Sequence, residues 1–170
     1  MAVSTHRSNY ILPFTYVESP NEKPIREADS RKEVKNAEVA FQLSFKANLW
    51  RDILGQNMDL WLAYTQRSFW QLYNDEDSSP FRETNYEPEI LLNFRTDYDL
   101  VWLKNRFINI GFNHQSNGQS DPLSRSWNRA VANFGFERVN LTLILKTWYR
   151  FPESSDKDDN PDIEDYLGYG

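Results

Sequence analysis

Three polar residues in the second half of the chain have the types and spacing that nucleophilic catalysis requires. His114 and Ser116 are two positions apart, and Asn128 follows after residues 117–127. A serine nucleophile needs a base within hydrogen-bonding reach, and the histidine needs a third group to fix its tautomer. Asn128 can accept the imidazole N–H but carries no charge, so it orients His114 without strongly stabilising the imidazolium. The alternative is that these are ordinary polar residues, hydrogen-bonded at the ends of strands.

The three residues fall on one face of two predicted neighbouring strands. Side chains two positions apart in a strand point the same way, so each residue extends an apolar series. Those series are Ile108, Ile110 and Phe112 before His114, and Ala130, Ala132 and Phe134 after Asn128. Three groups able to form a hydrogen-bonded chain are therefore expected on one apolar wall.

Alternation of apolar and polar residues with a period of two recurs along the chain, whereas helical periodicity is weak. It predicts strands at residues 9–16, 39–47, 60–73, 87–98, 106–116, 128–136 and 139–151. The connections alternate between long polar loops (residues 74–87, 117–127 and 152–165) and shorter turns (55–59, 100–105 and 137–138). This alternation is typical of an outer-membrane β-barrel, and the last strand is long enough to cross a hydrocarbon core when tilted. A soluble β-sandwich explains the strand pattern equally well.

Composition limits the classes of function. The chain has 170 residues, which is usual for one domain, and its formal charge of −6 argues against a nucleic-acid partner. There is no cysteine, and His6 and His114 are the only histidines, so a histidine-rich zinc site is not expected. No apolar run is long enough for a membrane helix, and the N-terminus lacks the apolar core of a signal peptide. Residues 1–8 are expected to form a flexible tail.

Gln66 is a second polar residue on an apolar face. It lies in the middle of the strand predicted for residues 60–73, on the same face as Leu62 and Tyr64. An amide that faces hydrocarbon is costly unless it is paired. It either hydrogen-bonds to another subunit, or its side of the strand is covered by its own chain, or a bulge shifts the alternation of the strand.

Three segments of the chain resemble the outer membrane phospholipase A family. The first is HQSNGQSDPLSRSWNR at residues 114–129. The second comprises YTQRSFWQL at 64–72 and SSPFRETNYEP at 78–88, and the third is DNPDI at 159–163. The segments are long and have the family's order and spacing, and the resemblance extends from about residue 9 to the end of the chain.

The resemblance implies an antiparallel β-barrel of about twelve strands in the bacterial outer membrane, acting on phospholipid esters. Ser116 is the implied nucleophile, His114 the general base and then acid, and Asn128 the residue that orients His114. The Gly118 amide is expected to help form the oxyanion hole.

The family resemblance also implies a calcium site that is completed in a homodimer. Its expected ligands are the carbonyl of Gln119, the hydroxyl of Ser124 and the carbonyl of Ser78 of the partner subunit. Oxygen ligands suit calcium, a hard cation. Gln66 is expected near the middle of the dimer interface.

The chain departs from the family pattern in two ways. Gln119 stands where the family carries Arg, although a backbone carbonyl as ligand tolerates that change. The alternation gives seven strands, plus a possible eighth near Tyr166, so residues 1–170 are expected to form a single β-barrel domain that is truncated at its C-terminus. Two other hypotheses stay open: a non-catalytic barrel fragment and a soluble β-sandwich binding module.

Overall fold

The computed structural model describes residues 2–20, 22, 26, 33–76, 80–120, 123–153 and 158–159. These residues form eight β-strands and one short 3-10 helix. In chain order the elements are β1 (Val3–Thr5), β2 (Tyr10–Tyr16), β3 (Ala37–Trp50), η1 (Ile53–Gly55), β4 (Met58–Trp70), β5 (Phe81–Leu100), β6 (Leu103–Ser116), β7 (Ser126–Arg138) and β8 (Leu141–Arg150). The seven strands predicted by alternation are β2 to β8, and the all-β prediction is confirmed. The possible eighth strand near Tyr166 lies outside the described residues.

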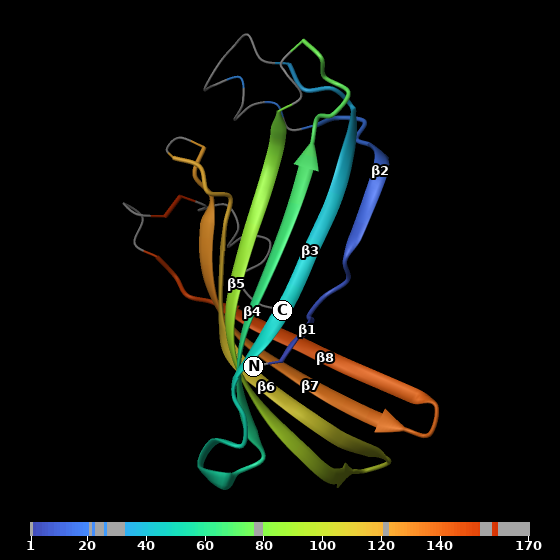
Figure 1. Cartoon of the computed structure of the whole chain (residues 1–170), viewed down its shortest axis with the longest axis vertical. Helices are drawn as coiled ribbons and strands as arrows, with labels where there is room; N and C mark the ends of the chain where they lie inside the picture. The colour runs from blue at the N-terminus through green and yellow to red at the C-terminus, as the bar shows by residue number, and fades with distance from the viewer. Residues whose placement is uncertain are drawn as a thin grey trace.

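The strands form one antiparallel sheet in the order β1-β3-β4-β5-β6-β7-β8, and β2 also pairs with β3. The sheet is long and strongly twisted, so that β6 to β8 point in a clearly different direction from β3 to β5 (Figure 1). Short connections at 51–57, 101–102 and 139–140 lie at one end of the strands, and the long connections at 71–80 and 117–125 lie at the other. Among the described residues no pairing joins β8 to β1 or β2, so the sheet is open.

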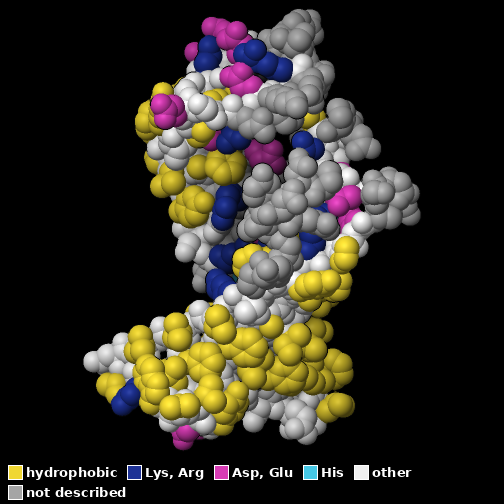
Figure 2. Space-filling model, turned by 180° about the vertical axis from the view of Figure 1, so that it is seen from behind, with side chains coloured by type: hydrophobic (Ala, Val, Ile, Leu, Met, Phe, Trp, Pro, Cys, Tyr) yellow, Lys and Arg dark blue, Asp and Glu magenta, His cyan; other side chains and the backbone are white. Residues whose placement is uncertain are grey.

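The two faces of the sheet have the opposite character to those of a soluble protein. One face is polar and closely packed, with Ser44, Thr65 and Asn113 buried. The other face leaves large apolar side chains exposed, including Ile90 at 52% and Ile110 at 51%. Figure 2 shows such side chains gathered into a broad surface over the lower part of the molecule. A β-sandwich buries its apolar faces between two sheets, and here no second sheet of the described residues covers that face, which favours the barrel over the sandwich.

No helix among the described residues is both long and apolar enough to span a membrane.

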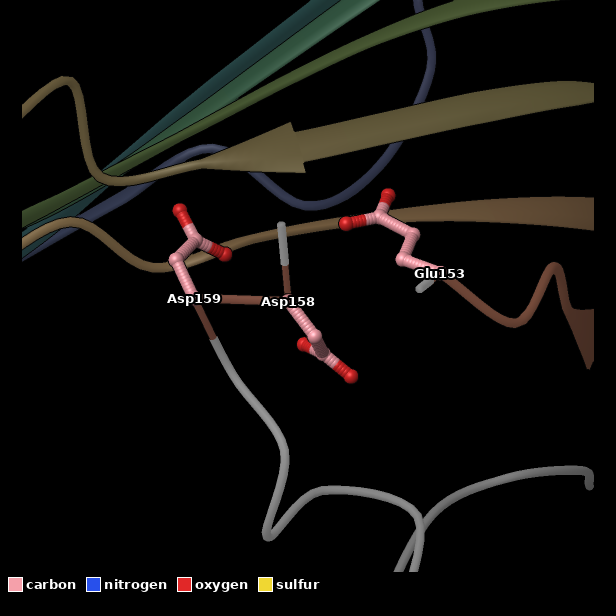
Figure 3. Close-up of side chains that lie close together, drawn as sticks. All are labelled: Glu153, Asp158 and Asp159. Carbon is pink, nitrogen blue, oxygen red and sulfur yellow. The ribbon is translucent and has the colours of Figure 1, made fainter. Parts of the chain in front are cut away.

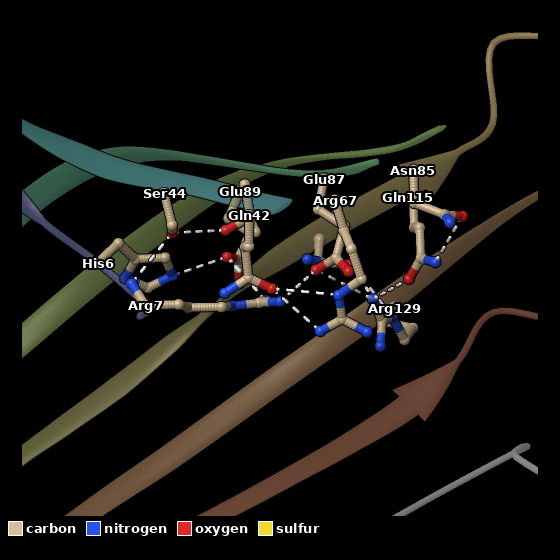
Figure 4. Close-up of polar contacts among 12 residues, drawn as sticks. His6, Arg7, Gln42, Ser44, Arg67, Asn85, Glu87, Glu89, Gln115 and Arg129 are labelled. Carbon is tan, nitrogen blue, oxygen red and sulfur yellow. Dashed lines mark hydrogen bonds and ion pairs between the residues drawn. The ribbon is translucent and has the colours of Figure 1, made fainter. Parts of the chain in front are cut away.

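The polar face is held together by ion pairs that involve the N-terminal segment (Figure 4). Arg7 contacts Glu87 at 2.5 Å and Glu89 at 3.0 Å, while His6 Nε2 lies 2.7 Å from Glu89. Within the segment that was expected to be a flexible tail, residues 1–8, Val3–Thr5 forms β1, and His6 and Arg7 pair with the carboxylates of β5. His6 is thereby held on the face opposite to Ser116, which leaves His114 as the candidate base.

Several strand boundaries differ from those predicted, and two of the differences have a clear physical reason. The last hairpin turns at residues 139–140 and not at 137–138, with Val139 at a φ of +46°, so β8 is shorter than predicted. A β-branched residue rarely adopts that conformation, and the sequence therefore gives no turn signal there. The polar sequence of residues 74–87 predicts a loop, whereas β5 begins at Phe81. Arg82 instead pairs with the buried Glu38 at 2.7 Å, which keeps this segment in the sheet.

Gly111 in β6 lies where two neighbouring strands approach closely. A Cβ there would lie 2.1 Å from the Ile90 carbonyl oxygen, which belongs to backbone and cannot rotate away. At Gly135 the nearest group is the Phe107 ring, 2.2 Å from the added Cβ, and that ring can turn. We expect Gly111→Ala to destabilise the sheet by about 2–3 kcal/mol, the range of strong overpacking, and Gly135→Ala by less. Urea-unfolding midpoints followed by tryptophan fluorescence in detergent test this, and equal midpoints for the two variants would contradict it.

Candidate active site

His114 and Asn128 face each other directly across the β6–β7 pair. Their Cα atoms are register partners, and His114 Nδ1 lies 2.9 Å from Asn128 Oδ1. The amide oxygen can only accept, so this contact requires the proton on Nδ1 and leaves Nε2 free to accept another. The pairing that a catalytic triad requires between base and orienting residue is therefore present.

The predicted facing of the three residues is confirmed by their neighbours in the strands. Asn113 and Gln115 point to the polar face, where Arg129 donates to both. His114 and Ser116 therefore point to the opposite face, together with the exposed Phe112. The candidate residues are half-buried, so a long apolar molecule lying along this wall can reach them.

Ser116 lies at the end of β6, between Tyr86 of β5 and Ser126 of β7 in the register of the sheet. Among the described side chains it makes no hydrogen bond to His114. Two positions along a strand separate the Cα atoms by about 6.7 Å, so the side chains must lean together for contact. Hydrogen bonds of this kind are often long before substrate binds, and they shorten in the complex.

Asn117 organises the loop that joins β6 to β7, and sequence reasoning did not single it out. Its Oδ1 accepts from the backbone N–H groups of Gln119 at 3.2 Å and Arg125 at 3.0 Å, and its Nδ2 donates to the Leu123 carbonyl at 2.7 Å. A buried asparagine with three such hydrogen bonds fixes the conformation of its loop. The sequence feature that could have pointed to Asn117 is its position directly after a strand and before Gly118. The loop therefore returns on itself beside Ser116.

Gly118 meets a requirement that no other residue type satisfies well. Its φ is +67°, and an added Cβ would lie 2.9 Å from Cε2 of the Tyr86 ring. Glycine thus allows the loop backbone to pass close to Ser116. The predicted role of its amide in an oxyanion hole remains a prediction.

Asp159, in the segment after β8, ties that segment to the start of β7. Its carboxylate accepts from the Ser124 hydroxyl, and from the Ser126 backbone N–H at 2.8 Å and hydroxyl at 3.1 Å. Partial burial opposes ionisation, but these hydrogen bonds outweigh it and hold the pKa of Asp159 below its ordinary value. Sequence reasoning named this residue only within a family-like segment and gave it no role.

Glu153, Asp158 and Asp159 bring three carboxylates together, with one oxygen from each within 4.8 Å of the others (Figure 3). Asp158 also pairs with Arg150 at 2.8 Å. Glu153 accepts a hydrogen bond from Asn128 Nδ2 at 3.0 Å, so the acidic group is directly connected to the candidate triad.

Comparison with known proteins places the chain in a family. The sequence model of the family described as Phospholipase A1 matches residues 1–170. The chain belongs to the phospholipase A1 family. It is 47% identical over 164 residues to a phospholipase A1 of Klebsiella pneumoniae, covering 96% of this chain and 56% of that protein. It is 45% identical to a putative phospholipase A1 of Neisseria meningitidis, covering 100% of this chain and 47% of that protein.

The solved structures most useful for comparison are those of outer membrane phospholipases. The Escherichia coli enzyme superposes with a TM-score of 0.88 at 44% identity, covering 99% of this chain and 69% of that one. The Salmonella typhi dimer with bound calcium superposes with a TM-score of 0.88 at 43% identity, covering 99% and 65%. This member of the phospholipase A1 family spans about half the length of the curated relatives it matches.

The oxygen groups near the loop of this phospholipase A1 family member fit a calcium ion. The Ser124 hydroxyl donates to the Asp159 carboxylate, and Gln119 belongs to the same loop as Ser124. Uncharged oxygens combined with a carboxylate are the donor set that calcium prefers. The third predicted ligand, Ser78, lies outside the described residues.

The Gln66 amide has partners within its own chain. Its Oε1 accepts from the Tyr64 hydroxyl at 3.1 Å, and its Nε2 donates to Ser68 Oγ at 3.1 Å, which Thr84 also contacts at 3.2 Å. Hydrogen bonds within the chain therefore account for a glutamine on this apolar face. The predicted place of Gln66 in a dimer interface remains a prediction.

Proposed function

We propose that this chain belongs to a bacterial outer-membrane enzyme that hydrolyses the acyl ester bonds of phospholipids, with calcium and as a homodimer. The observation that carries the proposal is the His114–Asn128 contact at 2.9 Å on an exposed apolar face, two residues from Ser116. A hydrolase for water-soluble substrates has no need to present its base on such a face. Phospholipid tails fit that surface, and the exposed Ile110 and Phe112 lead along it to the reacting groups.

The reaction follows from the positions of the protons. Ser116 Oγ forms a bond to the ester carbonyl carbon while its proton moves to Nε2 of His114, and the carbonyl electron pair moves to oxygen. Nδ1–H remains bonded to Asn128, which leaves Nε2 as the nitrogen that takes the proton. The carbonyl then re-forms, the bond to the lysophospholipid oxygen breaks, and His114 returns the proton to that oxygen. Water then repeats the sequence and releases the fatty acid and Ser116.

The loop beside Ser116 stabilises the charge that develops on the ester oxygen. The Gly118 N–H donates to it, and removal of one such donor typically costs about 10²–10³-fold in turnover. Ser124 and Asp159 would hold a calcium ion, which would supply positive charge beside the loop. In a homodimer, Ser78 of the partner subunit would supply a further ligand to that ion.

The test is release of fatty acid from phospholipid in mixed detergent micelles by the folded chain with calcium. We expect release that increases linearly with time and stops on chelation. A folded chain that binds phospholipid without releasing fatty acid would support the non-catalytic fragment instead.

Asn128→Ala is expected to lower turnover less than His114→Ala does. Fixing the tautomer assists the base but does not replace it, so a loss of about tenfold is expected against about 10³-fold or more. Initial rates under saturating phospholipid measure the ranking. Comparable losses in the two variants would contradict it.

Gln66→Leu is expected to weaken self-association in detergent modestly. A hydrogen bond between membrane strands or helices is worth about 1 kcal/mol, or roughly fivefold in dimer dissociation. Ser68→Ala is the matched control, since it removes one of the two partners that Gln66 has in its own chain but keeps the amide. Unchanged crosslinking of the Gln66 variant over a dilution series would exclude an interface role.

A further inference from the structure

Asn128 is held from two sides, and the second contact decides which way its amide points. Its Oδ1 meets His114 Nδ1 at 2.9 Å, and its Nδ2 donates to Glu153 Oε1 at 3.0 Å. An ionised carboxylate can only accept, so the amide nitrogen must face Glu153 and the oxygen must face His114. Without Glu153 the amide could turn over and offer an N–H to the imidazole, which would favour the wrong tautomer.

The segment that carries Glu153 is anchored beside Asn128. The Phe151 N–H donates to the Asn128 carbonyl at 2.9 Å, which continues the β7–β8 pairing one residue past β8. The Phe151 ring packs against Phe112 with centroids 6.1 Å apart and against Tyr149 at 6.2 Å. Pro152 then fixes its own φ, so few backbone rotations separate these anchors from Glu153.

We propose that Glu153 is a positioning residue for the active site: it fixes the amide of Asn128 and thereby holds His114 in the tautomer that can take the Ser116 proton. The proposal rests on the proposed function of the triad. The Glu153 carboxylate also supplies the negative charge that asparagine lacks. That charge, on the far side of the Asn128 amide, stabilises the imidazolium that forms during the reaction. Glu153 touches neither the substrate nor the imidazole and acts through Asn128.

A shared cation is the competing role for Glu153, since it lies with Asp158 and Asp159. Each of these carboxylates already has a protein donor: Asn128 for Glu153, Arg150 for Asp158 and the two serines for Asp159. The Glu153 carboxylate is therefore satisfied by Asn128 within the chain, which favours the positioning role over a ligand role for this residue.

The direct test measures the tautomer of His114 without any substrate. Imidazole nitrogen-15 shifts of the folded chain in micelles with chelator are expected to show a protonated Nδ1 and an unprotonated Nε2. In Glu153→Leu we expect a mixture of the two tautomers, whereas Glu137→Gln, which removes a carboxylate at the other end of β7, should leave the shifts unchanged. An unchanged tautomer in a folded Glu153→Leu variant would overturn the proposal even if the chain hydrolyses phospholipid. A calcium requirement raised without any tautomer change would do the same, because it would make Glu153 a cation ligand.

The separate effects on kcat and KM supply a second readout, which would not change in this way if Glu153 had only a structural role. Glu153→Leu is expected to lower kcat about tenfold with KM within about twofold, since only the base is disturbed. Asn128→Asp places the new carboxylate against that of Glu153, and the two repel each other. When Glu153→Gln is added, the glutamine amide can donate a hydrogen bond to the aspartate, and the repulsion is removed. The double variant should therefore exceed Asn128→Asp by at least about threefold, although Glu153→Gln alone lowers kcat. Equal effects of Glu153→Gln in both backgrounds would show that the two side chains do not interact, and would overturn the proposal.

Discussion

Alanine at Ser116 or at His114 is expected to abolish phospholipid hydrolysis, with at least about a 10³-fold loss in turnover for either change. The reason is that the two side chains act as one unit, so loss of either removes the same step. The strands should remain intact, because both side chains lie on the exposed face and contribute little to the polar face that holds the sheet. Tryptophan emission and the unfolding midpoint check folding beside the activity assay.

Labelling with a serine-directed sulfonyl reagent separates the nucleophile from its neighbours. Ser116 is expected to react only when calcium is present, and Ser116→Ala should remove the label. Ser120→Ala is the matched control, since that exposed serine lies four residues further along the same loop. Labelling at Ser124 or Ser126 in the unmodified chain would assign the nucleophile to another residue.

Alternation along the chain was sufficient to predict the sheet and the facing of the candidate residues, because strand periodicity fixes which face each side chain occupies. It placed His114, Ser116 and Asn128 on one wall, and in the structure the first and last of these lie 2.9 Å apart. It could not reveal β1, because three residues are too few to show a period, and the pairing of Arg7 with Glu87 spans 80 residues of sequence.

Glu153 and Asp159 were not predicted as site residues for a related physical reason. Both follow the last described strand and reach the site only because β8 returns antiparallel to β7, which brings the chain back to Asn128. A polar loop sequence contains no period from which such a contact can be read. Asn117 was missed because its role is to bond its own loop, and its residue type is common at strand ends.

Chelation of calcium is expected to stop hydrolysis completely while the strands stay folded. The sheet is held by its own backbone pairing and by ion pairs such as Arg7 with Glu89, none of which needs a metal. The loop at residues 117–127 contains Asp121 as its one carboxylate, and Asp159 contributes a second one beside Ser124. So few carboxylates in the loop and beside Ser124 predict an affinity in the millimolar range or somewhat tighter, since charge count tunes calcium binding.

If Ser78 of the partner subunit completes the ligands, calcium binding and dimerisation must strengthen each other by the same free energy. Calcium affinity should therefore rise at least about fivefold between low and high protein density in micelles, the lower end of usual coupling. Ser124→Ala should raise the calcium needed for half activity while Ser116 still reacts with the sulfonyl reagent at saturating calcium. Equal affinity at both densities would mean that one chain holds every ligand. An unchanged calcium dependence in Ser124→Ala would show that the Ser124 hydroxyl is not a ligand. The Asp159 carboxylate, no longer hydrogen-bonded to Ser124, would then be the group that binds the ion on this side of the loop.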